Sequence, residues 1–256
     1  MNPEKFAIAV GVAVFVGGSL GLVSHRVLPE KHLTGGGKDM IGAVVGLLTL
    51  LSALVLGLLI WTAYGVYAGQ SAAIQTLAAK VLQLDLALSD YGPEANDVRA
   101  QLRQGLGKTI DEIWASNESD ANFLANNFAA AIHNLRSREA SLATLHPSTD
   151  AQTQALAAAK ATVESIAQSR LQMSFALASP ISIPLIVIVA AWAAVLFFGY
   201  GLMSGGSATS FAALAGGALA IASAAYLILD LSSPYSGIFR PSSAPLEQVL
   251  AIMGKE

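Results

Sequence analysis

Residues 40–66 read MIGAVVGLLTLLSALVLGLLIWTAYGV, and this uninterrupted apolar stretch decides the fold of the chain. It contains no Asp, Glu, Lys or Arg. The hydrocarbon core of a bilayer is roughly 30 Å thick and takes about 20 apolar residues of helix to cross. We therefore predict that this stretch is a membrane-spanning helix.

Three further apolar runs accompany this stretch, at Phe6–Ser24, Ile181–Met203 and Ala208–Leu231, and none has a charged residue in its interior. We predict an all-α polytopic membrane protein with four transmembrane helices, two on each side of a polar helical insert. The first run is too long for the core of a signal peptide. His25 and Arg26 follow it where a small-residue cleavage site would stand, so we expect a retained helix.

The overall composition agrees with a membrane protein. Apolar residues make up 54% of the chain and charged residues 12%, whereas soluble globular domains carry about 25% charged residues. The net charge of −3 gives no basic field for nucleic acid. Cysteine is absent, which excludes disulfides, thiolate metal sites and thiol catalysis. We expect the lipid bilayer as a partner, and no cofactor, metal or nucleic acid.

We divide the chain into four parts: membrane helices in 1–66, a polar insert in 67–180, membrane helices in 181–231 and a tail in 232–256. Apolar residues recur along the insert at helical spacing, which predicts four helices that bury their apolar faces in an antiparallel bundle. The four stripes are Ile74, Leu77, Val81, Leu84 and Leu88; Val98, Leu102, Leu106, Ile110 and Ile113; Leu124, Phe128, Ile132, Leu135, Leu142 and Leu145; and Leu156, Ala159, Val163, Ile166, Met173 and Leu177.

Glycine and proline mark the expected ends and contacts of these helices. Gly92 and Pro93 predict a boundary between two insert helices, because Gly accepts the left-handed conformation after a helix and Pro suits the first turn of the next. Gly17 and Gly21 have the spacing that allows close helix packing in lipid, although Gly is also simply tolerated in membrane helices. Pro180 and Pro184 predict a kink or break at the start of the third membrane helix.

No catalytic constellation is visible in the sequence, and the four histidines lack metal-ligand spacing, so we do not expect an enzyme. The polar side chains of the second membrane helix are the candidate pore-lining residues. Such hydroxyls most often bond to their own helix backbone, and the alternative is that they face a water-filled path. The candidates are Thr49, Ser52, Thr62 and Tyr64.

The tail contains a second group of candidate residues, in the stretches LDLSSPYSG (229–237) and SSAPL (242–246). A carboxylate at a helix C-terminus opposes the helix dipole, so we expect Asp230 to pair with Arg240. We also expect the tail to fold back onto the membrane surface, with Tyr235 and Phe239 anchored at the interface. The candidate structural motif comprises Asp230, Pro234, Tyr235, Ser236, Gly237 and Arg240.

These tail stretches resemble the closing signature of the bacterial bestrophin-like domain family. Shorter stretches at Leu84-Asp85, 91–94, Ile110-Asp111 with Trp114, and 197–202 also resemble that family. The chain departs from the usual pattern at Ser232, where the family has an acidic residue, and at Pro241. The resemblance implies four membrane helices with a helical insert between the second and the third. The family name alludes to bestrophins, which are pentameric anion channels, but no bestrophin pore residue can be placed here.

Two functions compete on these observations. The first is a homo-oligomeric ion channel or transporter, with anions as the candidate ions, because four spans are too few to enclose a pore in one copy. The alternative is a membrane-anchored scaffold or sensor whose helical bundle binds a partner, which the absence of charge inside the spans favours. Counting Lys and Arg near the spans gives a slight preference for cytosolic termini and a cytosolic insert, in a bacterial inner membrane.

Overall fold

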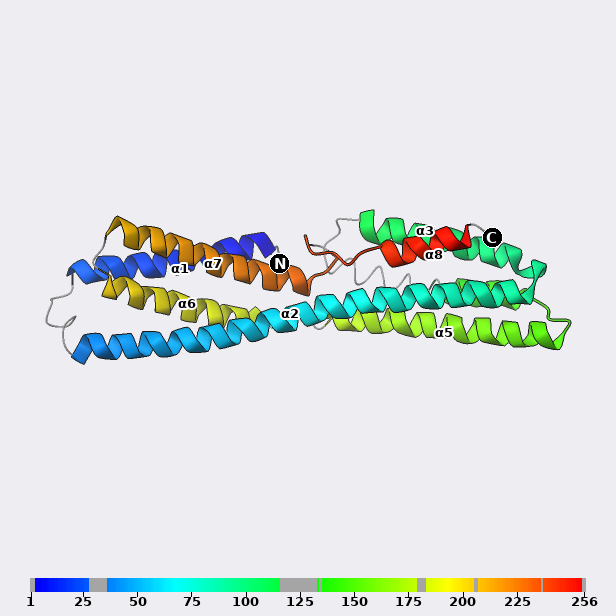
Figure 1. Cartoon of the computed structure of the whole chain (residues 1–256), viewed down its shortest axis with the longest axis horizontal. Helices are drawn as coiled ribbons and strands as arrows, with labels where there is room; N and C mark the ends of the chain where they lie inside the picture. Colours follow the sequence, from blue (N-terminus) through cyan, green and yellow to red (C-terminus); the bar gives the residue numbers. More distant parts are fainter. Residues whose placement is uncertain are drawn as a thin grey trace. The chain divides into compact units, whose positions relative to one another are not determined.

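The computed structural model describes residues 3–27, 36–115, 133, 135–178, 183–204, 207–235 and 237–254, and within these ranges the chain is helical with no strand. This confirms the all-α fold. The helices are α1 (Pro3–Val27), α2 (Gly36–Tyr91), the short 3₁₀ helix η2 (Pro93–Ala95), α3 (Asn96–Ala115), α5 (Asp150–Ala178), α6 (Ile183–Met203), α7 (Ala208–Ser232) and α8 (Ala244–Met253) (Figure 1). Residues 135–143 form a further helical segment.

Four of these helices, α1, α2, α6 and α7, are long and apolar enough to cross a membrane. This confirms the four predicted membrane spans. The helix α2 is 56 residues long, well beyond the 20 or so residues that a bilayer core requires. Its apolar first part therefore suffices for the span, and its second part continues as a helix of mixed polarity.

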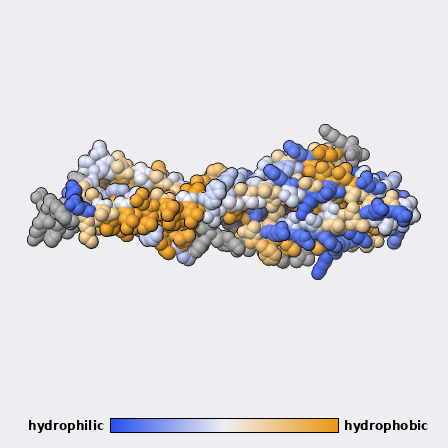
Figure 2. Space-filling model, turned by 60° about the horizontal axis from the view of Figure 1, so that its bottom comes forward, coloured by the Kyte–Doolittle hydropathy of each residue, from blue (hydrophilic) through white to orange (hydrophobic). Residues whose placement is uncertain are grey.

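The chain divides into two compact units. The membrane unit comprises Met1–Gly65 and Ile181–Ser232, and the polar unit comprises Val66–Pro180 and Ser233–Glu256. In Figure 2 hydrophobic residues dominate the visible face of the membrane unit, whereas hydrophilic residues are frequent on that of the polar unit. This difference is what lipid on one surface and water on the other require.

In the membrane unit, α1 packs against both α6 and α7 (Figure 1). Their shared core is made of small and β-branched side chains, which allow helices to approach closely in lipid. The buried members of this core are Val10, Val14, Ala193, Ala218 and Ala225. The helix α7 begins at a serine turn, where the hydroxyl of Ser207 accepts the backbone N–H of Ser210.

In the polar unit, the second part of α2 packs with α3, segment 135–143, α5 and α8 around one apolar core. The predicted stripes supply most of this core, because each helix turns its apolar face inward. Buried stripe residues are Ile74, Leu77, Val81, Leu84, Leu88, Leu102, Leu106, Ile110, Leu142, Leu145, Leu156, Ala159, Val163 and Ile166. Leu124, Phe128 and Ile132 lie outside the described residues.

The expected boundary at Gly92 and Pro93 is present. The helix α2 ends at Tyr91, and Pro93 opens the 3₁₀ turn that leads into α3. Gly92 has φ 114° and ψ −171°, a region that only Gly occupies readily and not the left-handed helical one that we expected. The turn is held by the Gly92 N–H, which donates to the carbonyl of Ser89 at 3.1 Å.

The structure tests the expectation for Pro184 in part, since α5 ends at Ala178, α6 begins at Ile183 and residues 179–182 are not described. Pro184 is the second residue of α6, a position where the backbone N–H has no intrahelical partner, so proline removes no hydrogen bond there. It therefore starts α6 and does not kink it. Pro180 lies outside the described residues.

Candidate functional site

The glycines of α1 form a close contact with α6. A Cβ atom added at Gly17 would lie 2.7 Å from the carbonyl oxygen of Ala194, and one at Gly21 would overlap the carbonyl oxygen of Phe198. These glycines therefore have the close-packing role that their spacing predicted. At the same end of the two helices, Nδ1 of His25 lies 2.8 Å from the carbonyl oxygen of Leu202.

The threonines of α2 bond to their own helix. Thr49 donates to the carbonyl of Val45 at 2.8 Å, and Thr62 donates to the carbonyl of Leu58 at 2.8 Å. Thr49 also contacts the hydroxyl of Tyr200 on α6 at 3.1 Å. The structure therefore brings Thr49 together with a partner that the sequence did not indicate, and it leaves Thr62 exposed on α2.

Ser52 is the exception among the candidate hydroxyls. Its Oγ is buried and has no hydrogen-bond partner among the described residues. It lies one turn after Thr49 on the same face of α2. A buried hydroxyl that finds no partner is costly, and this one lies on the face of α2 whose Thr49 meets Tyr200 of α6. Tyr64, the last candidate, is exposed.

The tail motif packs into the polar unit. Tyr235 is 8% exposed, and its hydroxyl donates to Oε1 of Gln70 at 3.2 Å. The amide of Gln70 in turn donates to the carbonyl of Met173 on α5 at 3.1 Å. The expectation that Tyr235 anchors at the membrane interface is therefore wrong, because its ring joins the apolar core of the polar unit. Burial also raises the pKa of Tyr235 above its ordinary value.

Trp114 at the end of α3 holds the rest of the tail. Its indole N–H donates to the carbonyl of Pro241 at 2.8 Å, and its ring meets that of Tyr235 edge to face, with centroids 6.5 Å apart. Arg240 donates from Nε to the carbonyl of Gly237 at 3.2 Å and from Nη1 to that of Trp114 at 3.4 Å. The tail thus forms a clamp over α3.

Three other members of the predicted tail motif have different outcomes. Pro234 is fully buried. Ser236 lies outside the described residues. Asp230 is 1% exposed, and the hydroxyl of Tyr226 donates to its Oδ1 at 3.2 Å. The pairing of Asp230 with Arg240 stays a prediction.

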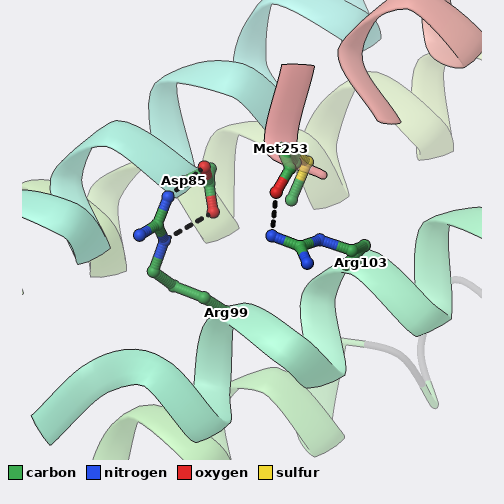
Figure 3. Close-up of polar contacts among 4 residues, drawn as sticks. All are labelled: Asp85, Arg99, Arg103 and Met253. Atoms are coloured by element: carbon green, nitrogen blue, oxygen red, sulfur yellow. Dashed lines mark hydrogen bonds and ion pairs between the residues drawn. The ribbon is translucent and has the colours of Figure 1, made fainter. Parts of the chain in front are cut away.

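A buried ion pair joins α2 and α3 (Figure 3). Arg99 donates from Nε to Oδ1 of Asp85 at 2.9 Å and from Nη2 to Oδ2 at 2.8 Å. Asp85 is 2% exposed, so the paired geometry compensates a carboxylate taken out of water. One turn further along α3, Arg103 donates to the carbonyl of Met253 and thereby caps the last turn of α8 (Figure 3).

Sequence reasoning missed this pair, although a signal was present. Asp85 follows Val81 by four residues and precedes Leu88 by three, which places it on the apolar stripe of α2. An acidic residue on an apolar stripe needs a cation or hydrogen-bond donors as partners. Arg99 satisfies that requirement from the first turns of α3, once Gly92 has reversed the chain direction.

The described residues contain no group of His, Cys, Asp and Glu side chains that could hold a metal ion. Polar contacts in the polar unit are those of a packed helical bundle with cationic side chains on its inner faces. In the membrane unit the bonded polar side chains are hydroxyls, the imidazole of His25 and the carboxylate of Asp230.

Comparison with known proteins relates this chain to one protein family. The family model described as the bestrophin-like domain matches residues 11–246. That range runs from within α1 to the first turn of α8 and so includes most of the first membrane span, the other three spans, most of the polar unit and the tail clamp. No curated protein matches the chain, and no solved structure does.

Proposed function

The chain belongs to the bestrophin-like family, and we propose that this membrane protein assembles as a homo-oligomer that conducts small ions, anions first among them. Four helices in one copy cannot enclose a water-filled path easily, so the path would run between several copies. Conduction needs no catalytic groups, which agrees with a role other than that of an enzyme.

The observation that carries this proposal is the uncovered surface of α2. Only 11% of its most apolar 18-residue window is buried, whereas the figure is 33% in both α1 and α6. Added Cβ atoms at Gly46 and Gly57 would meet nothing within 4 Å. Small residues that leave a helix backbone accessible are the means by which membrane helices associate. A second copy of the chain is therefore a fitting partner for α2.

The polar groups of α2 also make this helix the candidate that lines the ion path. The partnerless hydroxyl of Ser52 and the Thr49–Tyr200 pair lie on its membrane part. Ion pathways can be lined by hydroxyls and backbone carbonyls without charged side chains. The absence of charge inside the spans is therefore compatible with passage of ions.

The test has two steps. Purification in detergent, with the mass of the protein–detergent particle determined, should give a multiple of the 26.4 kDa chain. Reconstitution into liposomes loaded with an anion-sensitive dye should then give flux that empty liposomes lack. A monomeric mass together with the absence of flux in chloride, nitrate and potassium salts would contradict the proposal.

The second candidate function is a membrane-anchored scaffold or sensor, whose polar unit binds a partner. It is favoured by Thr49 and Thr62 of α2, because their hydroxyls already bond to backbone carbonyls of their own helix and need no water as a partner. It is also favoured by the tail clamp, because the tail packs on α3 and so gives the polar unit a defined surface on which a partner could bind. An oligomer without flux would support this function over conduction.

We also propose that the termini and the polar unit are cytosolic, in a bacterial inner membrane. The chain contains no cysteine, so a single Ser148→Cys variant offers one label site on the exposed turn before α5. A membrane-impermeant maleimide should label this variant in inverted inner-membrane vesicles and not in intact spheroplasts. The reverse result would place the polar unit outside the cytosol.

A further inference from the structure

A cavity of about 110 Å³ lies inside the polar unit. It is enclosed by α2, α3, segment 135–143 and α5. Its apolar lining comes from leucine and valine side chains, and its polar lining from Gln101, Ser137, Ser141 and Arg138. The apolar members are Leu84, Leu88, Val98, Leu102, Leu142 and Val163. Gln101 and Ser137 are exposed at its edge, which leaves an entrance from solvent.

Arg138 is the charged group of this cavity, and its guanidinium is not fully bonded. Nη1 is buried, and no residue that the structure describes accepts a hydrogen bond from it. A guanidinium presents five N–H donors in a planar fork that matches a carboxylate or a phosphate. A buried donor without an acceptor costs free energy, and Arg138 is the one charged side chain among the described residues that line the cavity.

The electrostatic surroundings of Arg138 do not provide that acceptor. Burial, and after it the nearby positive charge of Arg170, together lower the pKa of Arg138 from its ordinary value to about 10. Arg170 is itself buried, which lowers its pKa, and Glu112 opposes that effect. Two cations and one carboxylate thus share this region, and an anion in the cavity would balance the excess positive charge.

A glycine keeps the space beside the guanidinium open. Gly105 lies in the interior of α3 and lines the cavity, although glycine within a helix costs roughly 1 kcal/mol relative to alanine. A Cβ atom added there would lie 3.8 Å from Nη2 of Arg138. Any longer side chain at this position would occupy the space where a ligand could meet the guanidinium.

We propose that this cavity is a binding site for a small organic carboxylate, whose carboxylate pairs with Arg138 and whose short alkyl chain lies on the leucines. A purely inorganic oxyanion would pair with the guanidinium, but the apolar side chains that line the cavity would stay in contact with water. The cavity therefore fits an ion with one charged end and one apolar end. This inference concerns the polar unit and is independent of conduction through the membrane unit.

The experiment measures the melting temperature of the full-length protein in detergent, with sodium butyrate as the probe. Butyrate at about ten times its dissociation constant should raise Tm by about 3 °C relative to chloride at equal ionic strength. Butyramide, which has the same shape and no charge, should not. Phosphate should raise Tm less than butyrate does. A butyramide or phosphate effect equal to that of butyrate would overturn the proposal.

The variant Arg138→Gln should lose the response to butyrate. Arg136→Gln is the matched control, because Arg136 lies on the same helical segment and is exposed, so it should retain the full response. Without ligand, Arg138→Gln should keep or raise Tm, since it removes a buried cation that lacks an acceptor. An undiminished response in Arg138→Gln would overturn the proposal.

A second variant keeps Arg138 and supplies the anion from the chain. In Gly105→Asp the carboxylate would reach the guanidinium of Arg138, so Tm without ligand should rise and butyrate should have no further effect. This variant distinguishes a missing anion from a merely structural arginine. A fall in Tm together with a preserved butyrate response would overturn the proposal.

Discussion

At the scale of single residues, charged side chains on the inner faces of the polar unit have the largest consequences. Asp85 and Arg99 form a bidentate pair in which the carboxylate is 2% exposed. Such a pair contributes little net stability compared with an apolar pair, but loss of either member leaves a buried charge uncompensated. It therefore fixes how α2 and α3 pack, because alternative packings would separate the two charges.

We expect Asp85→Asn to destabilise the protein by about 3–5 kcal/mol, since the guanidinium of Arg99 would stay buried without its carboxylate. Chemical denaturation in detergent would measure this difference. Asp90→Asn is the matched control on the same helix: Asp90 is exposed, so its replacement should stay within about 0.5 kcal/mol of the wild type. Equal effects of the two substitutions would show that the buried pair has no special role.

The second prediction at this scale concerns Tyr235 and pH. At pH 7, Tyr235→Phe should cost about 1 kcal/mol, because the hydrogen bond to Gln70 is lost. Burial raises the folded-state pKa of Tyr235 above about 10, its value in the unfolded chain. Above pH 10 the unfolded state therefore loses the proton first, and wild-type stability falls as pH rises.

The difference between wild type and Tyr235→Phe should consequently be constant from pH 7 to about 10 and shrink between pH 10 and 11. Thermal melts of both proteins across this range give the measurement, and each protein at pH 7 is its own reference. A difference that stays constant up to pH 11 would mean that Tyr235 ionises as readily in the folded protein as in the unfolded one.

At the scale of helices, apolar periodicity was sufficient to predict most elements. The four spans and the bundle stripes follow from the length and spacing of apolar residues alone, because lipid and a packed core impose strict patterns. The same patterns do not predict where Tyr235 lies, because a tyrosine side chain is favoured both at a membrane interface and in a protein core. Only the contacts with Trp114 and Gln70 decide between the two.

The turn at Gly92 provides a prediction for an element boundary. Gly92→Ala should cost about 1–3 kcal/mol, because the φ of 114° is strained for any residue with a Cβ atom. Gly69→Ala is the matched control: Gly69 lies within α2 with nothing near its added Cβ, and this change should stabilise the protein by about 0.5–1 kcal/mol. Thermal melts that shift in the same direction for both variants would exclude a special conformation at Gly92.

At the scale of the whole molecule, three of the short stretches that resemble the family come together within the polar unit. Asp85, Trp114 and Tyr235 lie far apart in sequence, and all three contribute to how α2, α3 and the tail pack there. The candidate site could be predicted only in part. Hydroxyls on α2 were visible in the sequence, but the pairing of Thr49 with Tyr200 and the partnerless Ser52 depend on helix packing that no local pattern records.

The last prediction tests the path of ions through an oligomer. Ser52→Leu should abolish flux in liposomes while expression and oligomer mass stay unchanged. Leucine would replace the one buried hydroxyl on α2 that has no partner in the described residues with a larger apolar side chain. Dye-based flux and particle mass are measured on the same preparation. This separates a blocked path from a failed assembly.

Ser223→Leu on α7 is the matched control for this experiment. Ser223 is exposed and its hydroxyl donates to the carbonyl of Ala220 on its own helix, so leucine there should face lipid and leave flux intact. Since both variants add the same side chain to a membrane helix, a loss of flux in Ser52→Leu alone assigns the path to the Ser52 face of α2. Normal flux in Ser52→Leu would move the path to another helix, and equal loss in both would indicate a general effect of added bulk on the membrane unit.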